Sequence, residues 1–369
     1  MIGTARRWTA TPRAGGAGAR CLGGWRGVLR RAAVLWCASG VLGLAGAQGV
    51  GAFGGGSAPD RMAGPPERSV AEWLVRLQQA SRIPSYVGTF VVSSSSGAMS
   101  SARIWHVCEG NLQLERVEAL SGAPRSTYRR NELVVTFMPE ARIVRTERRV
   151  AGGMFPNLLN PGGNFSTADH YSAREMGRDR VAGFDADVVL LSPRDDLRFG
   201  YRIWSEKRTG LVVKTQTLDA AGRVLEQAAF SELQLDAPVR AAKPQLAMPS
   251  TDGYRVEKPE RVRTSAADEG WTLKAPVAGF QPQNCYRRPV SPSASMVQWI
   301  FSDGLATVSL FMEPFDAQRH GHEGVSAMGA THTLTRRLTD PAGAWWITAV
   351  GEVPPRTLRA FVDGLERKN

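Results

Sequence analysis

The stretch RIWHVCEGNLQLERVEALSG, residues 103–122, holds a histidine, a cysteine and three glutamates between His106 and Glu118. It can be read as a reactive cluster or as two β-strands joined by a turn. β-branched and aromatic residues alternate with polar ones on both sides of Glu109-Gly110-Asn111, which is a turn sequence. The pattern favours a β-hairpin with strands at 101–107 and 112–120.

Strand geometry argues against chemistry at this hairpin. Side chains alternate between the two faces of a strand, so His106 and Cys108 share a face, whereas Glu115 and Glu118 lie on opposite faces. A metal site needs further imidazole or thiolate ligands, and a Cys–His nucleophile needs an oxyanion hole that nothing in the flanking sequence marks. A hydrolase using His106 and Cys108 is therefore the least favoured interpretation, and two ordinary packed strands are expected.

Similar runs of β-branched and aromatic residues recur on both sides of the hairpin and are separated by turn residues. Because most are spaced as hairpins, they predict a mostly antiparallel sheet. The further predicted strands are 86–96, 132–137, 141–147, 186–192, 199–206, 211–219 and 223–233. The segment 154–165, MFPNLLNPGGNF, is apolar but broken by proline and glycine, so we expect it to cover one face of the sheet.

A helix is expected before the sheet and another at the end of the chain. Ser69 and Glu72 form a capping-box sequence, and Val70, Trp73, Leu74 and Leu77 follow at helical spacing to about Ala80. Pro354-Pro355 opens the last helix, with apolar residues at 358, 361, 362 and 365. Strands at 295–304, 305–313, 331–338 and 344–352 precede it.

These patterns divide the chain into five parts. We expect a signal peptide over 1–47, a flexible Gly/Pro/Ala-rich segment over 48–68 and a large half-barrel domain over 69–238. A Pro- and charge-rich linker over 239–268 and a small α+β domain over 269–366 follow. The predicted fold class is α+β and mostly antiparallel β, with a large unclosed β-barrel that carries a packed helix.

The first 47 residues have the features of a secretory signal: seven arginines, no acid, a short apolar run and a small-residue end at Ala45-Gly46-Ala47. We expect cleavage after Ala47, with an uncleaved anchor as the alternative. The formal charge of the whole chain is +12, but without this segment 39 Lys and Arg remain against 34 acids. The mildly basic remainder has no Lys/Arg run and predicts no nucleic-acid partner.

Two cysteines and three histidines raise the question of a disulfide or a metal. Cys108 and Cys285 either form a disulfide, as export would allow, or remain as buried free thiols. His320, His322 and His332 with Glu323 could bind zinc or copper, but a solvated loop is the ordinary explanation. No P-loop or dinucleotide motif occurs, so the sequence predicts no cofactor, no metal and no enzyme activity.

A binding protein is favoured instead, because an antiparallel sheet that curls without closing offers an apolar face to acyl chains. The residues expected to line such a lipid cavity are Phe90, Val92, Ile104, Leu112, Leu114, Val134, Phe137, Phe155, Leu158 and Leu159. For any one of them, ordinary core packing is the alternative. Arg125, Arg129 and Arg130 are candidates for contact with anionic head groups, against the alternative of a solvated outer face.

Four segments in order carry a family resemblance: HVCEGNLQLERVEALSGAPRSTYRR (106–130), FGYRIWSEKRTGLVVKTQTLDAAGRVLEQAAFSEL (199–233), IFSDGLATVSLFME (300–313) and ITAVGEVPPRTLRAF (347–361). Together they resemble the periplasmic sigma-E regulators of the MucB/RseB family over nearly all of 70–365. No single motif among them is specific for catalysis. The histidine-rich loop and the Cys108/Cys285 pair are departures from the family pattern.

The resemblance implies a periplasmic negative regulator of an envelope-stress sigma factor. Its large domain would be similar to lipoprotein-carrier proteins. The chain would bind the periplasmic domain of a membrane-spanning anti-sigma factor (RseA/MucA-like), shield it from proteolysis and sense lipid or lipopolysaccharide. Homo-oligomers are left open. The alternative is a periplasmic lipid or lipoprotein carrier, against which the second domain argues.

Overall fold

The structure is a computed structural model of the chain. It describes residues 68–80, 83, 85–148, 155–156, 158–159, 166–239, 246–291, 294–341 and 343–368. The expected signal peptide, its cleavage after Ala47 and almost all of the segment 48–68 lie outside these residues. No described helix is both long and apolar enough to cross a membrane.

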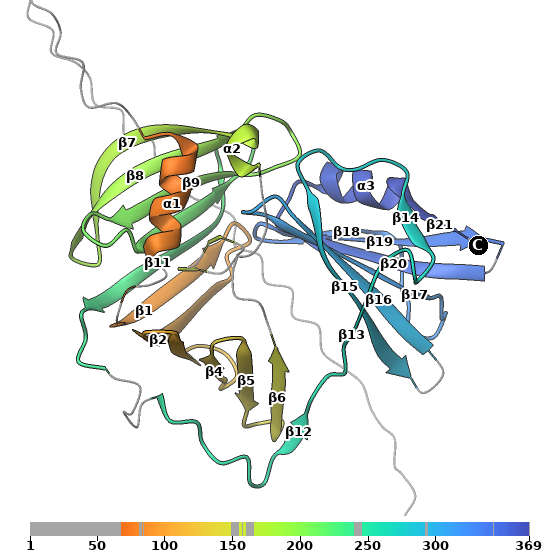
Figure 1. Cartoon of the computed structure of the whole chain (residues 1–369), viewed down its shortest axis with the longest axis horizontal. Helices are drawn as coiled ribbons and strands as arrows, with labels where there is room; N and C mark the ends of the chain where they lie inside the picture. Colours follow the sequence, from red (N-terminus) through yellow and green to blue (C-terminus); the bar gives the residue numbers. More distant parts are fainter. Residues whose placement is uncertain are drawn as a thin grey trace, which may run out of the picture. The chain divides into compact units, whose positions relative to one another are not determined.

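The first large element is a twelve-stranded sheet (Figure 1). Its strand order is β12-β6-β5-β4-β3-β2-β1-β11-β10-β9-β8-β7, and β12 and β7 do not pair with each other, so the sheet is not a closed barrel. All neighbours are antiparallel except β12 and β6. The strands are β1 (Ser85–Ser94), β2 (Met99–Glu109), β3 (Leu112–Ala119), β4 (Ser126–Arg130), β5 (Leu133–Met138), β6 (Ile143–Arg148), β7 (Tyr171–Val181), β8 (Phe184–Pro193), β9 (Gly200–Glu206), β10 (Val212–Leu218), β11 (Val224–Leu235) and β12 (Arg255–Glu257).

The quoted stretch forms the β2–β3 hairpin, as the sequence predicts. Only Gly110 and Asn111 separate the strands, and Gly110 has a φ of 57°, a left-handed conformation that glycine adopts without steric cost. This turn fixes the register, in which Glu109 pairs with Leu112 and Trp105 with Arg116. One hairpin therefore sets which side chains of both strands share a face.

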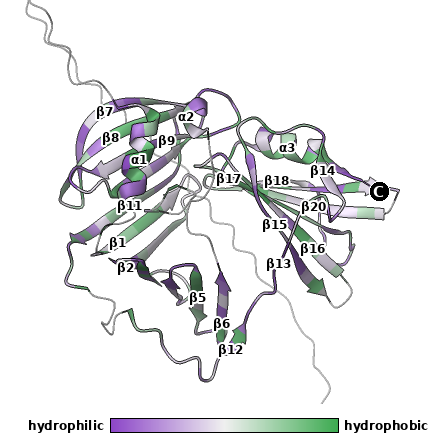
Figure 2. Ribbon diagram, in the orientation of Figure 1, coloured by the Kyte–Doolittle hydropathy of each residue, from purple (hydrophilic) through white to green (hydrophobic). Residues whose placement is uncertain are grey.

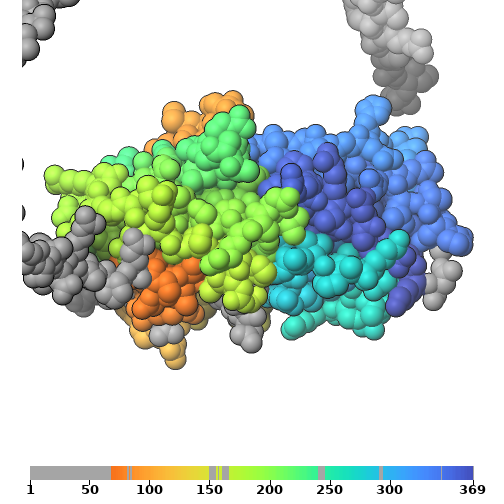
Figure 3. All heavy atoms as spheres, turned by 90° about the horizontal axis from the view of Figure 1, so that it is seen from above, coloured from red at the N-terminus to blue at the C-terminus, as the bar shows by residue number. Residues whose placement is uncertain are grey.

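Helix α1 (Val70–Ala80) packs against one face of this sheet, which we call the helix face. Its N-terminus has the predicted capping box, because Glu72 accepts hydrogen bonds from the backbone N–H and the hydroxyl of Ser69 at 2.7 and 2.8 Å. Trp73 and Leu77 are buried with Ile203 of β9. The hydrophobic residues of α1 lie among hydrophilic ones (Figure 2), and the helix, in orange, borders the yellow-green residues of this sheet (Figure 3).

The second large element is a seven-stranded antiparallel sheet with the order β13-β15-β16-β17-β20-β19-β18. Helix α3 (Pro355–Gly364) covers one of its faces, so that Leu358 and Phe361 are fully buried against Leu310 and Ile347. The strands are β13 (Val262–Thr264), β15 (Gln281–Ser291), β16 (Ala294–Ser302), β17 (Thr307–Pro314), β18 (Gly324–Met328), β19 (Thr331–Asp340) and β20 (Gly343–Gly351). The short helix α2 (Thr167–His170) and a two-stranded sheet of β14 (Trp271–Leu273) and β21 (Leu365–Arg367) complete the elements.

The segment predicted as a linker contributes one short strand to each of the two large sheets. Within 239–268, β12 adds a parallel strand to β6 of the first sheet, and β13 adds an antiparallel strand to β15 of the second. Tyr254 also packs against Phe137 with 5.6 Å between ring centroids. Proline and charge in this segment led to the linker prediction, but three-residue edge strands need no apolar alternation of their own.

Candidate binding sites

The helix face gathers part of the predicted lipid-cavity set. The register from β1 to β5 places Phe90, Val92, Ile104 and Val134 on this face. Phe90 contacts Phe230 of β11, with 6.2 Å between ring centroids. All four side chains are buried or half-buried, and Ile104 and Phe90 belong to a hydrophobic core cluster of the sheet.

Leu112, Leu114 and Phe137 lie on the opposite face. Leu114 pairs with Val107, whereas its neighbour Glu115 pairs with His106 on the helix face, so the alternation turns Leu112 and Leu114 away. Phe137 is buried in a separate cluster with Tyr128, Val135 and Val144. The faces of Leu112 and Leu114 follow from the register of the β2–β3 hairpin, whereas the face of Phe137 also depends on the registers of β4 and β5.

The described residues of the segment 154–165 pack on the helix face. The Phe155 ring lies 5.4 Å from that of Phe90 and 5.1 Å from that of Phe230 between centroids. Leu158 and Leu159 pack against the cluster that holds Trp73 of α1. Phe155, Leu158 and Leu159 therefore cover part of the apolar surface of the helix face.

A buried polar cluster sits at the edge of this apolar surface. His106, which is 1% exposed, donates its Nδ1–H to Oε1 of Glu115 at 2.9 Å, and Arg129 donates to Oε2 at 3.0 Å. Burial alone raises the pKa of Glu115, but the hydrogen bond from His106 and the charges of His106 and Arg129 outweigh it and lower the pKa. The ring of Tyr86 stacks on that of His106 at 4.6 Å.

This cluster is not among the residues predicted from the sequence, because the partner of Glu115 lies on the neighbouring strand. The sequence does contain the information needed to find it, because a two-residue turn at Gly110-Asn111 places residues 106 and 115 directly opposite each other. A histidine, a glutamate and an arginine on neighbouring strands at one level of the sheet form a charge-assisted network. The cluster fixes the hairpin, and Cys108 lies two pairs beyond the His106–Glu115 pair, opposite Gln113.

The three arginines proposed for head groups do not converge. The guanidinium of Arg129 is held by Glu115, by Gln113 Oε1 at 3.3 Å and by the carbonyl oxygen of Asn131 at 2.8 Å. Arg130, the next residue of β4, points to the other face, and Arg125 is exposed before the strand. Arg129 therefore has a structural partner set, and a head group would meet Arg125 or Arg130 separately.

Cys108 and Cys285 are both free thiols in the structure. Cys108 is half-buried on β2, whereas Cys285 is buried on β15. Burial raises the pKa of Cys285 to about 11, so it remains a thiol at neutral pH. Of the two alternatives for these residues, the structure holds the free thiols.

The three histidines of the C-terminal part have separate surroundings. His320 accepts a hydrogen bond from the backbone N–H of Asp316 at 2.9 Å and stacks on Trp346 at 5.1 Å. His332 lies beside Phe199, and His322 is exposed. No group of three or more His, Cys, Asp or Glu residues within the described ranges is arranged to hold a metal ion.

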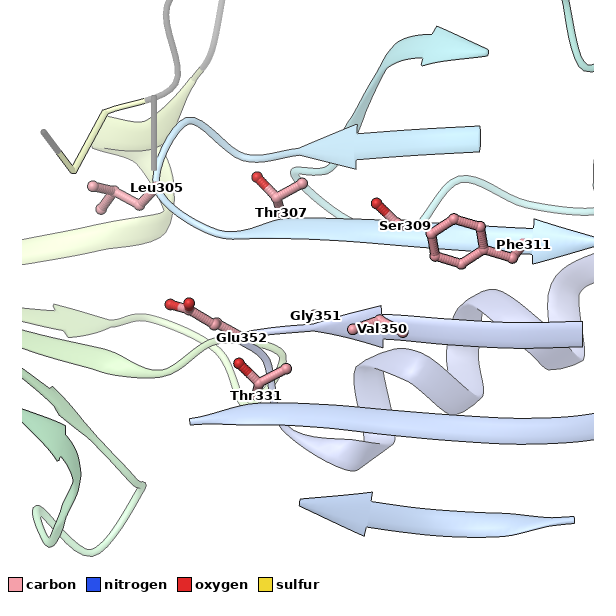
Figure 4. A pocket seen from close by; sticks show the side chains of 8 residues that line it. All are labelled: Leu305, Thr307, Ser309, Phe311, Thr331, Val350, Gly351 and Glu352. Carbon is pink, nitrogen blue, oxygen red and sulfur yellow. The ribbon is translucent and has the colours of Figure 1, made fainter. Parts of the chain in front are cut away.

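A groove of about 260 Å³ lies on the face of the seven-stranded sheet that α3 does not cover (Figure 4). Thr307, Ser309 and Phe311 of β17 line it, because the alternate residues Val308 and Leu310 point to the α3 side. The other lining residues are Leu305, Thr331, Val350, Gly351 and Glu352. Hydroxyl, apolar and carboxyl groups thus share a shallow surface that suits a peptide segment.

Glu352 gives this groove a titratable group. Burial, and then the charge of Glu226 on β11, raise the pKa of Glu352 to about 7. Burial also raises the pKa of Glu226. The hydrogen bond from the backbone N–H of Ala330 lowers this pKa, but by less than burial raises it. At neutral pH, the Glu352 carboxyl is therefore protonated in a large fraction of molecules.

A second buried polar cluster joins the loop before β9 to the β16–β17 turn. Arg198 donates from Nε to Oδ2 of Asp303 at 2.7 Å, and neither side chain is exposed. Asp303 Oδ1 also accepts the backbone N–H groups of Leu305 and Ala306, at 2.9 and 2.7 Å. Tyr171 donates its hydroxyl to Asp303 Oδ2 at 3.2 Å, so the carboxylate is fully satisfied.

Family models match nearly the whole described chain. The MucB/RseB N-terminal domain matches residues 69–249, and the MucB/RseB C-terminal domain matches residues 265–366. Sigma factor AlgU regulatory protein MucB of Pseudomonas aeruginosa is 31% identical over 299 residues, which cover 77% of this chain and 86% of that protein. Sigma-E factor regulatory protein RseB of Haemophilus influenzae is 25% identical and covers 80% and 90% respectively.

Solved structures agree with this assignment. A crystal structure of MucB in complex with MucA(peri) superposes with a TM-score of 0.63 at 28% identity, covering 82% of this chain and 100% of that one. A complex structure of Pseudomonas aeruginosa MucA/MucB gives a TM-score of 0.64 at 27% identity, with 81% and 99% covered. Because the two family models together match most of the chain and MucB is 31% identical over 77% of it, the chain belongs to the MucB/RseB family of sigma factor regulatory proteins.

Proposed function

We propose that this protein is a periplasmic negative regulator that binds the periplasmic domain of a membrane-spanning anti-sigma factor. The observation that carries the proposal is the match to MucB over both of its domains, since MucB has been solved in complex with MucA(peri). Binding would shield the anti-sigma factor from the protease that cuts it first, so that the sigma factor stays sequestered.

The groove over β17 and β20 is the surface of this chain that we assign to the partner. It is shallow and open along two paired strands, and its hydroxyl groups can bond to a peptide backbone while Phe311 and Val350 contact apolar side chains. Ser309 lies in the middle of the β17 side of the groove (Figure 4). A large side chain there would fill the groove without entering the core.

The test is binding of the purified protein to the periplasmic domain of the anti-sigma factor from the same genome, measured by calorimetry. Ser309→Tyr should weaken the affinity by about tenfold or more, which is ~1.4 kcal/mol. Ser295→Tyr adds the same ring at an exposed position of the same sheet and should leave the affinity unchanged. No binding by the unsubstituted protein would reject the function, whereas equal binding by both variants would reject only the groove.

Lipid sensing is the second candidate function, and the packing of Phe155, Leu158 and Leu159 on the helix face supports it. A segment held by a few apolar contacts can be displaced by an acyl chain that makes similar contacts. Leu158→Asp should loosen this segment and raise the binding of a fluorescent fatty acid. Leu120→Asp, at an exposed position, is the control. Absence of fatty-acid binding in both variants and in the unsubstituted protein would reject the lipid role.

A further inference from the structure

One contact between the two large sheets lies at the turn between β18 and β19. This turn consists of Gly329 and Ala330, since Met328 pairs with Thr331. Gly329 has a φ of 62°, and a Cβ on it would lie 2.6 Å from Oε2 of Glu226, which belongs to β11 of the twelve-stranded sheet. The backbone N–H of Ala330 donates a hydrogen bond to the carboxylate of Glu226. A carboxyl of the first sheet therefore contacts the backbone of the second sheet directly.

A second carboxyl, that of Glu352, lies at the same end of the seven-stranded sheet. Glu352 directly follows β20 and lines the groove together with Thr331, the residue after Ala330 (Figure 4). Glu352 and Glu226 are both half-buried, and the negative charge of Glu226 acts on the Glu352 carboxyl. Two carboxyls, one from each sheet, thus share one contact, and we call them the carboxyl pair.

No cation among the described residues neutralises the carboxyl pair. Neither glutamate forms an ion pair with a described Lys, Arg or His. The residues paired with Glu226 on β1 and β10 are Ser94 and Thr217, which carry no charge. His332 of β19 donates its Nδ1–H to the carbonyl oxygen of Ala330 at 3.2 Å. The same turn residue is therefore held by His332 through its C=O and by Glu226 through its N–H.

The charged groups on the first-sheet side of Glu352 are also accounted for. Tyr201 of β9 faces Glu352, and burial followed by the charge of Glu352 raises the pKa of Tyr201 well above its ordinary value, so the phenol is neutral. Beyond Tyr201 lie Arg198 and Asp303, which bind each other at 2.7 Å. The one cation nearby is thus already paired, and the charge of the carboxyl pair depends on its own protons.

We propose that the carboxyl pair is a pH-dependent contact, which holds β11 to the β18–β19 turn while Glu352 is protonated and releases the turn when both glutamates are ionised. With Glu352 protonated, the pair carries a single negative charge, which the N–H of Ala330 stabilises. Ionisation of Glu352 puts two negative charges into a half-buried contact, where they repel each other more strongly than in water.

The release takes place near neutral pH and stays local. The pKa of Glu352 is about 7, so a small rise in pH changes the charge of the pair. The Arg198–Asp303 pair holds the two sheets together at another point and keeps its opposite charges over this range. Because Glu352 also lines the groove, the same ionisation changes the wall of that groove. The inference concerns the chain alone and does not depend on the proposed binding of an anti-sigma factor.

The experiment is hydrogen–deuterium exchange of the purified mature protein, read by mass spectrometry on peptides that contain the β18–β19 turn. Exchange is measured at about pH 5.5 and about pH 8.5, on either side of the pKa of Glu352. Each value is compared with that of Glu352→Gln at the same pH, so the chemical pH dependence of exchange cancels. The two proteins should exchange alike at the lower pH. At the higher pH, the turn of the unsubstituted protein should exchange about tenfold faster than that of E352Q.

Two further variants separate the carboxyl pair from a general effect of charge. Glu226→Gln removes the other charge of the pair and should behave like E352Q, with a turn that stays protected at the higher pH. Glu232→Gln removes a charge from an exposed position of the same strand β11 and should behave like the unsubstituted protein. Circular dichroism of each variant establishes that it is folded.

Two results would overturn the inference. One is equal exchange of the turn in the unsubstituted protein, E226Q and E352Q at the higher pH, which would mean that ionisation leaves the contact closed. The other is faster exchange throughout the unsubstituted protein, including peptides around Asp303, which would mean that ionisation destabilises the whole fold and does not release one contact.

Discussion

His106 and Glu115 form a buried pair across the β2–β3 hairpin, with 2.9 Å between the imidazole Nδ1 and the carboxylate Oε1. Arg129 on β4 binds the second oxygen of the same carboxylate. The pair therefore links three strands at one level of the twelve-stranded sheet. Glu115→Leu should destabilise the protein by about 3–5 kcal/mol, because it leaves His106 and Arg129 without their shared anion. Urea unfolding measures this change.

Glu132→Leu is the matched control for that substitution. Glu132 is exposed in the turn before β5, so its replacement should change the unfolding free energy by about 0.5 kcal/mol or less. Equal effects of the two substitutions would show that the His106–Glu115 pair does not stabilise the sheet.

Gly88 allows the aromatic ring of Phe230 to lie against β1. A Cβ at position 88 would lie 2.6 Å from Phe230 Cε1 and 2.8 Å from the carbonyl oxygen of Glu232. Gly88→Ala should therefore force the ring out of place and cost about 1–3 kcal/mol in thermal unfolding. Gly321→Ala meets no atom within 4 Å and should leave the melting temperature unchanged. A normal melting temperature for G88A would contradict the predicted close approach.

Loss of the Arg198–Asp303 pair should also destabilise the folded protein strongly. Arg198→Leu leaves the Asp303 carboxylate buried without its cation, and we expect a loss of about 3–5 kcal/mol in the free energy of unfolding. Arg174→Leu, at an exposed position of β7, is the control and should have little effect. A small loss for R198L would mean that the N–H donors of Leu305 and Ala306 suffice to hold the carboxylate.

Glu352 predicts a pH dependence of stability with a definite sign. Its pKa is about 7 in the folded protein, above the ordinary value of 4.5, so the folded state binds more protons between these two pH values. The contribution of Glu352 to the free energy of unfolding is therefore greatest below about pH 4.5. This contribution, on the order of 1–3 kcal/mol, is lost as the pH rises through about 7. Glu352→Gln should flatten this part of the stability curve, whereas Glu323→Gln, at an exposed loop position, should not. A curve unchanged by E352Q would contradict the prediction.

Local sequence patterns predicted the elements whose residues alternate or recur with a clear period. The capping box at Ser69, the hairpin around Gly110 and the proline-opened helix α3 are confirmed at these positions. β4, which is five residues long, was not predicted, and neither were β7, β15 and β18. β7 is rich in charge, β15 contains Pro282 and Pro289, and all of β18 is exposed, so none of them shows the apolar alternation of a half-buried strand.

By itself, the sequence determined the class of the protein: antiparallel β with a packed helix at each end, and the resemblance to sigma factor regulators that the family models support. Only the tertiary structure decided how residues of distant strands combine. It placed Phe137 in a cluster apart from that of Ile104, joined Arg198 to Asp303 and left β18 open at an edge. The physical reason is that alternation and turns act between neighbours in sequence, whereas faces, buried charge pairs and free edges depend on strand order across the whole sheet.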